Sequence, residues 1–224
     1  MTNMFLIDKR TMQFLFWGVL GLAFLNFFNY VLGMPYWIIT QFIYLGVDNN
    51  IPAWYSSMLF AVAAIVAWEC FVVGKSKNLS YVWQFLIFAA LMLILSCDEV
   101  SKFHETLGEF INKHFGLVNA DLAANTPWIW VGAPIAVGVF AVSFFMLKKI
   151  LSQIPGSLTY LGLGFALIIL GGVVLESSIN WLNHNELQWV WEMEIIVEES
   201  LEMIGTLSIA YAFVVWRNGQ TQKT

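Results

Sequence analysis

Five glutamates lie close together in the last apolar stretch of this 224-residue sequence. They are Glu192, Glu194, Glu198, Glu199 and Glu202, with mainly apolar residues between and around them. At about 100° per helical residue, Glu194, Glu198 and Glu202 share one face. Carboxylates held this close in an apolar setting repel one another. They therefore need shared protons, a positive partner or a bound cation.

A second acidic segment ends the third apolar run and also carries a histidine. It contains Asp98, Glu99, His104 and Glu105, and Glu176 closes the fifth apolar run. On a continuous helix Asp98, Ser101 and Glu105 would share a face, with His104 beside it and Glu99 turned away. Lys102 is the only nearby residue that could neutralise these acids.

These residue types predict a divalent metal site. Oxygen ligands suit Mg, Ca, Mn and Fe, and an added imidazole favours Mn, Fe or Zn. We expect Fe, Mn or Zn. The expected ligands are Asp98, His104, Glu105, Glu198 and Glu202. Glu199 and Glu176 are expected to act as catalytic acid or base or to support the ligands, and His184 could join from an outer loop.

Other readings of the same residues stay open. The acids could form a protonated hydrogen-bond network, and we expect Glu192 to be solvated above the membrane. A helical-bundle di-iron site normally uses Glu-x-x-His pairs, and the sequence has none. It also lacks the G-x-S-x-G and H-E-x-x-H motifs and a phosphate-binding glycine loop.

The chain that must position these residues has a membrane composition. It is 59% hydrophobic and 11% charged, whereas soluble domains carry roughly a quarter charged residues. We expect an all-α integral membrane protein, one domain over 1–224, built as a six-transmembrane-helix bundle. The expected spans are 12–32, 54–74, 80–100, 127–147, 157–178 and 190–216. The first is expected to be retained as a span, because it is too long for a signal peptide.

Lysine and arginine set the expected orientation. Only Lys102 and Lys113 of the ten basic residues fall on the side opposite the termini. By the positive-inside rule, both the N- and C-termini are then cytoplasmic. All but Asp8 and Glu69 of the 15 acidic residues, and all three histidines, fall on the outer side or in the outer half.

Helical rise places three carboxylate groups at one depth. Counting about 1.5 Å per residue back from Trp216 puts Glu202 about 21 Å and Glu198 about 27 Å along the helix. The same count puts Asp98 about 26 Å and Glu176 about 25 Å along their spans. We therefore expect acids of three helices to meet in the outer half of the membrane.

Four other features give narrower expectations. The aromatic segment 33–53 is expected to lie in the membrane interface or to cover the site as a lid. Glu69 is expected to pair with Lys75 or Lys148. The glycines of the fifth span are expected to permit close helix packing. Cys70 and Cys97 are too far apart in this topology to form a disulfide.

The two acidic segments also resemble a known pattern. Residues 95–105 read L-S-x-D-E-x-x-x-x-H-E, and residues 198–205 read E-E-x-x-E-M-x-G. These segments are similar to those of uncharacterised bacterial multipass membrane proteins. The resemblance implies that the two segments belong to one site, and it implies no particular activity.

Together these observations indicate a multipass protein of the bacterial cell inner membrane with a site toward the periplasmic face. The leading hypothesis is a metal-dependent hydrolase or oxidoreductase acting on a lipid or other apolar substrate. Expected partners are membrane lipids, partner membrane subunits or a second copy, and the acidic charge argues against nucleic acid. A cation or proton transporter and a non-catalytic accessory subunit remain as alternatives.

Overall fold

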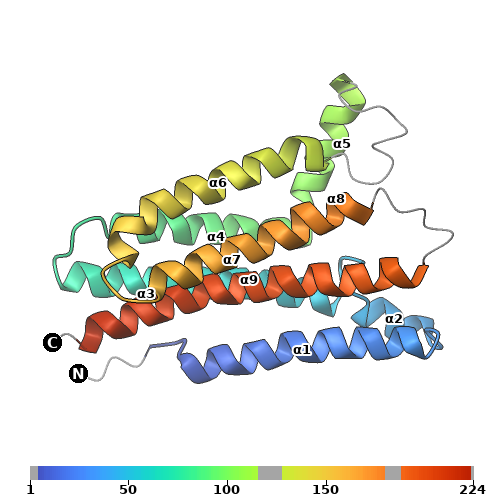
Figure 1. Ribbon diagram of the computed structural model, residues 1–224, viewed down its shortest axis with the longest axis horizontal. Coiled ribbons are helices and arrows are strands. Elements are labelled where there is room, and N and C mark those ends of the chain that lie inside the picture. Colours follow the sequence, from blue (N-terminus) through green and yellow to red (C-terminus); the bar gives the residue numbers. More distant parts are fainter. Residues whose placement is uncertain (1–4, 116–127, 180–187, 223–224) are drawn as a thin grey trace.

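The computed structural model describes residues 5–115, 128–179 and 188–222, and all its regular elements there are helices (Figure 1). They are α1 (Lys9–Val31), α2 (Trp37–Ile43), α3 (Ile51–Ser76), α4 (Trp83–Ser101), α5 (Phe103–Phe115), α6 (Trp128–Leu151), α7 (Ser157–Ile169), the π-helical η1 (Leu170–Leu175), α8 (Glu176–Ile179) and α9 (Gln188–Gln222). The predicted all-α class is confirmed for these residues.

Five helical segments are long and apolar enough to cross a membrane. They are Lys9–Val31, Ile51–Ser76, Trp83–Ser101, Gly132–Leu151 and Ser157–Ser178. These match the first five predicted spans, with boundaries shifted by a few residues. α9 carries five glutamates in its first half and is not among them. It nevertheless runs the length of the bundle, and it ends near the start of α1 (Figure 1).

α9 is the central helix of the bundle, and its second half forms the core. It packs against α1, α3 and α7. Trp216 and Phe213 are fully buried against two aromatic rings of α4. The ring centroids lie 4.7 Å apart for Phe85 and Trp216, and 5.1 Å apart for Phe88 and Phe213. Such packing fixes the register between α4 and α9, and therefore the level at which their acids meet.

Close backbone contact joins α7 to α9, as the glycines of the fifth span predicted. A Cβ on Gly164 would lie 2.6 Å from the carbonyl oxygen of Gly205. The reverse substitution would bring a Cβ on Gly205 to 2.8 Å from the carbonyl oxygen of Gly164. Any side chain at either position would push the helices apart.

α4 does not continue straight into α5. Lys102 adopts a left-handed conformation with φ 52°, which is uncommon for a residue with a side chain. Its backbone N–H still donates to the carbonyl oxygen of Asp98. The break interrupts the continuous face expected for Asp98, Ser101 and Glu105. It turns the chain so that His104 returns toward Asp98.

A buried ion pair lies at the end of the bundle where α1 begins and α9 ends. Arg217 donates to the carboxylate of Glu69, and the two residues are 1% and 5% exposed. Arg217 also donates to the carbonyl oxygen of Ile7 at 2.6 Å, and the N–H of Leu6 donates to Glu69 at 2.8 Å. The prediction that Glu69 pairs with Lys75 or Lys148 was wrong. α3 packs on α9, and this contact brings Arg217 to Glu69 instead.

The predicted aromatic segment contains the short helix α2, which has no buried residue. Trp37 and Phe42 are largely exposed there, so α2 presents an apolar surface outward. An exposed tryptophan on a short apolar helix suits the membrane interface. The two cysteines, Cys70 and Cys97, are both free, as predicted.

Candidate functional site

A cavity of about 420 Å³ lies between α4, α6, α7 with η1, and α9. Among the described residues, its lining contains seven carboxyl side chains and two basic ones. The acids are Asp48, Asp98, Glu99, Glu176, Glu198, Glu199 and Glu202, and the bases are Lys102 and His104. The two acidic segments of the sequence therefore meet in one cavity. We call the part lined by Asp98, Glu99, Glu198, Glu199 and Glu202 the acid end.

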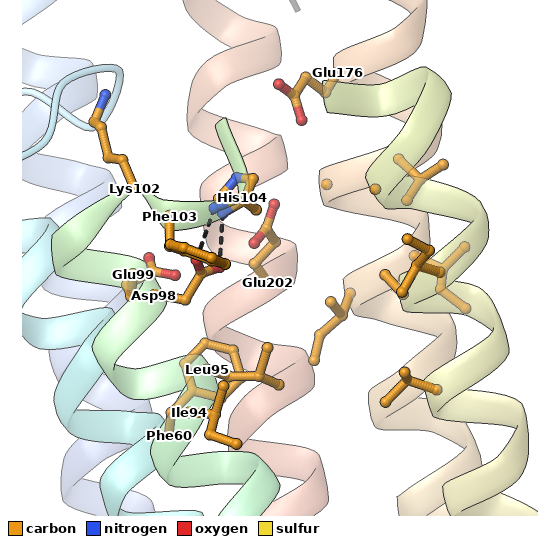
Figure 2. Close-up of a pocket in the computed structure, with 18 of the residues that line it drawn as sticks. Phe60, Ile94, Leu95, Asp98, Glu99, Lys102, Phe103, His104, Glu176 and Glu202 are labelled. Atoms are coloured by element: carbon orange, nitrogen blue, oxygen red, sulfur yellow. Dashed lines mark hydrogen bonds and ion pairs between the residues drawn. The ribbon is translucent and has the colours of Figure 1, made fainter. Parts of the chain in front are cut away.

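Asp98 and His104 form the best-defined polar contact of the acid end (Figure 2). The imidazole Nδ1 lies 2.6 Å from Asp98 Oδ2, and the backbone N–H of His104 donates to Asp98 Oδ1 at 3.0 Å. Asp98 thus holds both the ring and the first turn of α5. In the tautomer that donates from Nδ1, the basic lone pair is on Nε2. The bend at Lys102 creates this pair, which straight-helix spacing did not predict.

Lys102 pairs with Asp48, a residue that the sequence analysis did not select. Asp48 lies in the segment between α2 and α3, and both side chains are partly exposed. The pair ties this segment to the end of α4. The cation that seemed available to the buried glutamates is therefore engaged with a different acid. A lone aspartate in a loop gave no signal of this role.

Glu99 also lines the cavity, although helical spacing placed it away from Asp98. Its carboxylate lies near the hydroxyl of Ser56, a buried residue of α3. The first turns of α3 therefore lie beside Glu99 in the wall of the cavity. Glu99 was not among the predicted ligands or acid–base residues, and the structure adds it to the acid end.

Two glycines of η1 make room for the carboxylates of α9. A Cβ on Gly172 would lie 2.5 Å from Glu202 Oε1, and one on Gly171 would lie 2.8 Å from the carbonyl oxygen of Glu198. A single π-helical turn within an α-helix frequently marks a functional site. Here it places the glycines against the two glutamates. From the sequence, Gly171 and Gly172 predicted only close helix packing.

Glu194 and Glu198 face one another one helical turn apart. Their carboxyl groups are within hydrogen-bonding reach. Both oxygens of Glu194 are buried, and no donor faces them among the described residues. Two ionised carboxylates cannot donate to each other, so a shared proton or a bound cation would relieve the repulsion between them.

Glu192 is buried, so the prediction that it is solvated was wrong. The residue is 3% exposed, the Tyr44 hydroxyl lies near its carboxylate, and its Oε2 has no hydrogen-bond partner among the described residues. Burial, together with the nearby carboxylate, raises the pKa of the Tyr44 hydroxyl well above its ordinary value. The hydroxyl therefore stays protonated. The segment after α2 covers this part of α9, an arrangement that hydropathy alone does not reveal.

The remainder of the cavity is apolar. Figure 2 shows Phe60, Ile94 and Leu95 below the level of Asp98 and Glu202. Its wall on the opposite side comes from α6 and α7, including Val139, Phe140 and Ile168. The cavity thus joins a charged end to an apolar one. That lining suits an amphiphilic molecule better than a small ion alone.

The predicted metal ligands are only partly brought together. Asp98, His104, Glu198 and Glu202 line the cavity, whereas the side chain of Glu105 and all of His184 lie outside the described part of the structure. Among the side chains that are described, no three His, Cys, Asp or Glu groups are arranged to hold a metal ion. Asp98 contacts His104, which is the position of a group that orients a ligand.

The two predicted acid or base residues occupy different positions. Glu199 is part of the acid end. Glu176, at the first residue of α8, also lines the cavity but stands apart from Asp98 and His104 (Figure 2). Chemically, the arrangement offers an oriented imidazole that can accept a proton and carboxylates that can bind a cation. Both face an apolar chamber.

Comparison with known proteins gives a family but no activity. A family model described as Domain of unknown function (DUF8692) matches residues 12–216, which is most of the chain. No curated protein and no solved structure matches the chain.

Proposed function

The chain belongs to this DUF8692 family, and we propose that it is a metal-dependent membrane enzyme that acts on an amphiphilic, lipid-like substrate. In this proposal the protein lies in a bacterial inner membrane with both termini in the cytoplasm. α9 is its sixth span, and the acid end faces the periplasm. The observation that carries the proposal is one cavity that joins five excess carboxyl groups and an Asp–His pair to an apolar chamber.

The charge balance supports a bound cation. Counted over the described side chains, the cavity has five more carboxyl groups than basic groups, and both of these basic residues already contact acids, Lys102 with Asp48 and His104 with Asp98. Unbalanced carboxylates are costly at membrane depth. A divalent cation would offset part of the repulsion, and oxygen and imidazole groups suit Mn, Fe or Zn.

The ligand assignment changes in one respect. Because Asp98 contacts His104 Nδ1, its role in the proposal is to orient the imidazole toward a metal rather than to bind the metal itself. Glu198, Glu202 and His104 Nε2 remain the proposed ligands. The described side chains do not hold a three-ligand group as they stand, so the proposal requires these groups to draw together around the ion.

Transport is supported less well. A path for protons or cations across the membrane would need acidic groups at both ends of the bundle. Glu69, the acid expected on the far side, is engaged with Arg217 and with the backbone N–H of Leu6. That pairing suits a structural role. An accessory subunit remains the outcome if no cation binds.

The first test measures bound metal by mass spectrometry in protein purified in mild detergent, followed by reloading with Mn, Fe or Zn. We expect wild-type protein to hold metal and Glu198→Gln and Glu202→Gln to lose most of it. Glu109→Gln is the matched control, because Glu109 is exposed on α5 outside the cavity. A metal-free wild type under every loading condition would refute metal dependence.

A second test addresses the enzyme itself. Metal-loaded protein would be incubated with a panel of long-chain amphiphiles, and products would be followed by mass spectrometry. His104→Gln should lower conversion by about 100-fold or more, the usual effect of removing a general base or an equivalent ligand. Conversion that is unchanged in both His104→Gln and Glu202→Gln would exclude this cavity as the active site.

A further inference from the structure

A second, more open cavity of about 450 Å³ continues from the first between α4 and α6. The two cavities share Leu91, Ile135 and Val139 in their linings. The second is apolar except for one serine, and its remaining residues are Ile87, Gly138, Val142, Ser143 and Met146. The shared residues place the two cavities side by side along α4 and α6, and we call the two together the α4–α6 groove.

The groove exists because α4 and α6 meet only sparsely, whereas α4 packs extensively on α3. Gly138 contributes to it directly, since a Cβ there would have no atom within 4 Å. Ile87, Ile135 and Val142 on its rim are largely exposed. The groove is therefore open along its side, in the direction from which a lipid chain would enter.

The length of the groove matches an extended alkyl chain. Gly132 lines the first cavity and Met146 lines the second, and both are on α6. At about 1.5 Å per residue, these positions are about 21 Å apart along the helix. That is about two thirds of a hydrocarbon core about 30 Å thick. One long chain would fit this length, with its head at the acid end.

The acid end restricts the head group. With all groups ionised, the seven acids and two bases of the described lining leave an excess of five negative charges, and a divalent cation would leave three. A phosphate or sulfate head would be repelled, whereas an ammonium head would be attracted. The apolar groove therefore favours the hydrocarbon end of a ligand, and the acid end favours a cationic head group on the same molecule.

We propose that the α4–α6 groove binds the single alkyl chain of a long-chain amine, whose cationic head group lies at the acid end. This inference rests on the proposed function for the role of the cavity and adds the class of substrate. It does not require that a metal be bound. The chain lies against α6 past Gly138, and the head contacts the carboxylates of α4 and α9.

The test uses photo-crosslinking in phosphatidylcholine nanodiscs with octadecylamine that carries a diazirine in mid-chain. We expect crosslinks at groove residues of α4 and α6, mapped by peptide mass spectrometry. Unlabelled octadecylamine should compete, and octadecyl phosphate should not. Amines with shorter chains should compete more weakly, because each buried methylene contributes about 0.8 kcal/mol.

Gly138→Leu would fill the groove without touching the acids, and we expect it to lower crosslinking about tenfold, a loss of about 1.4 kcal/mol. Gly21→Leu on α1 is the matched control, because a Cβ at Gly21 also has no atom within 4 Å. Both substitutions remove a helix-interior glycine, so both proteins should fold. Gly138→Leu should keep the metal content of wild type.

Two outcomes would overturn the inference. Crosslinks spread over all lipid-facing helices and unchanged in Gly138→Leu would show that ordinary bilayer lipid fills the groove. Crosslinks to a second copy of the chain would show that the groove is an interface. Metal content, measured on the same samples, separates the two proposals. Specific labelling by the amine in metal-free protein would refute only metal dependence. Bound metal without specific labelling would refute only the proposed amine ligand.

Discussion

The two ends of the α3–α9 helix pair differ in whether their acidic groups are matched by basic ones. At one end Glu69 meets Arg217, and backbone groups of Leu6 and Ile7 complete the contacts. At the other end the described lining of the cavity has five more acids than bases. A matched pair with backbone support is typical of a group that holds the fold together. An unmatched set beside a cavity is typical of a group that binds something.

Breaking the matched pair should have the largest effect. Arg217→Leu leaves Glu69 buried without its cation, and we expect the free energy of unfolding to fall by about 3–5 kcal/mol. Denaturant titration in micelles would measure this. The double variant Glu69→Leu/Arg217→Leu should recover most of the loss, because it removes both charges. A cost below about 1 kcal/mol for the single variant, the range of an exposed pair, would contradict a structural role.

The contact between Tyr44 and Glu192 should come next in size. Tyr44→Phe removes the hydroxyl and leaves the carboxylate buried, so we expect a loss of about 1–3 kcal/mol in the same titration. Tyr36→Phe is the control, because Tyr36 is largely exposed. Equal stability of the two variants would show that Glu192 does not depend on Tyr44.

At the acid end, removing a charged group should raise the free energy of unfolding instead of lowering it. In metal-free buffer with chelator, Glu202→Gln removes one of several like charges, so we expect stability to rise by at least about 0.5 kcal/mol. With saturating metal the order should invert, because wild type gains about 2.7 kcal/mol at a metal concentration 100 times its dissociation constant. Glu109→Gln should change stability little in either buffer. Destabilisation by Glu202→Gln in chelator would make the acid end a structural network like the other end.

The exposed pair should matter least. Lys102 and Asp48 are partly exposed, so we expect Asp48→Asn to lower stability by about 0.3 kcal/mol at low salt. The loss should shrink at 1 M salt, where the screening length falls to about 3 Å. Unfolding at two salt concentrations would measure it. A large, salt-independent loss would show that Asp48 belongs with the buried groups.

Much of this architecture was predictable from local pattern. Five apolar runs became the five membrane-compatible helices, because length and hydropathy are properties of a single segment. The glycines of span five did mark the close approach of α7 to α9. Helical rise also predicted that Asp98, Glu176, Glu198 and Glu202 would reach a common cavity, since equal numbers of residues give equal depths.

The pairing of charges was decided only by the tertiary structure. The sequence pattern predicted the wrong cation for Glu69, predicted that Glu192 is solvated and predicted no partner for Asp48. Each of these contacts comes from a distant segment of the chain. The Asp98–His104 contact depended on one left-handed residue at Lys102, which spacing rules do not predict. Composition and periodicity determined which helices form and how far along each helix its acids lie. Which side chains then meet depends on helix contacts and bends, because ion pairs and hydrogen bonds form only within a few ångströms.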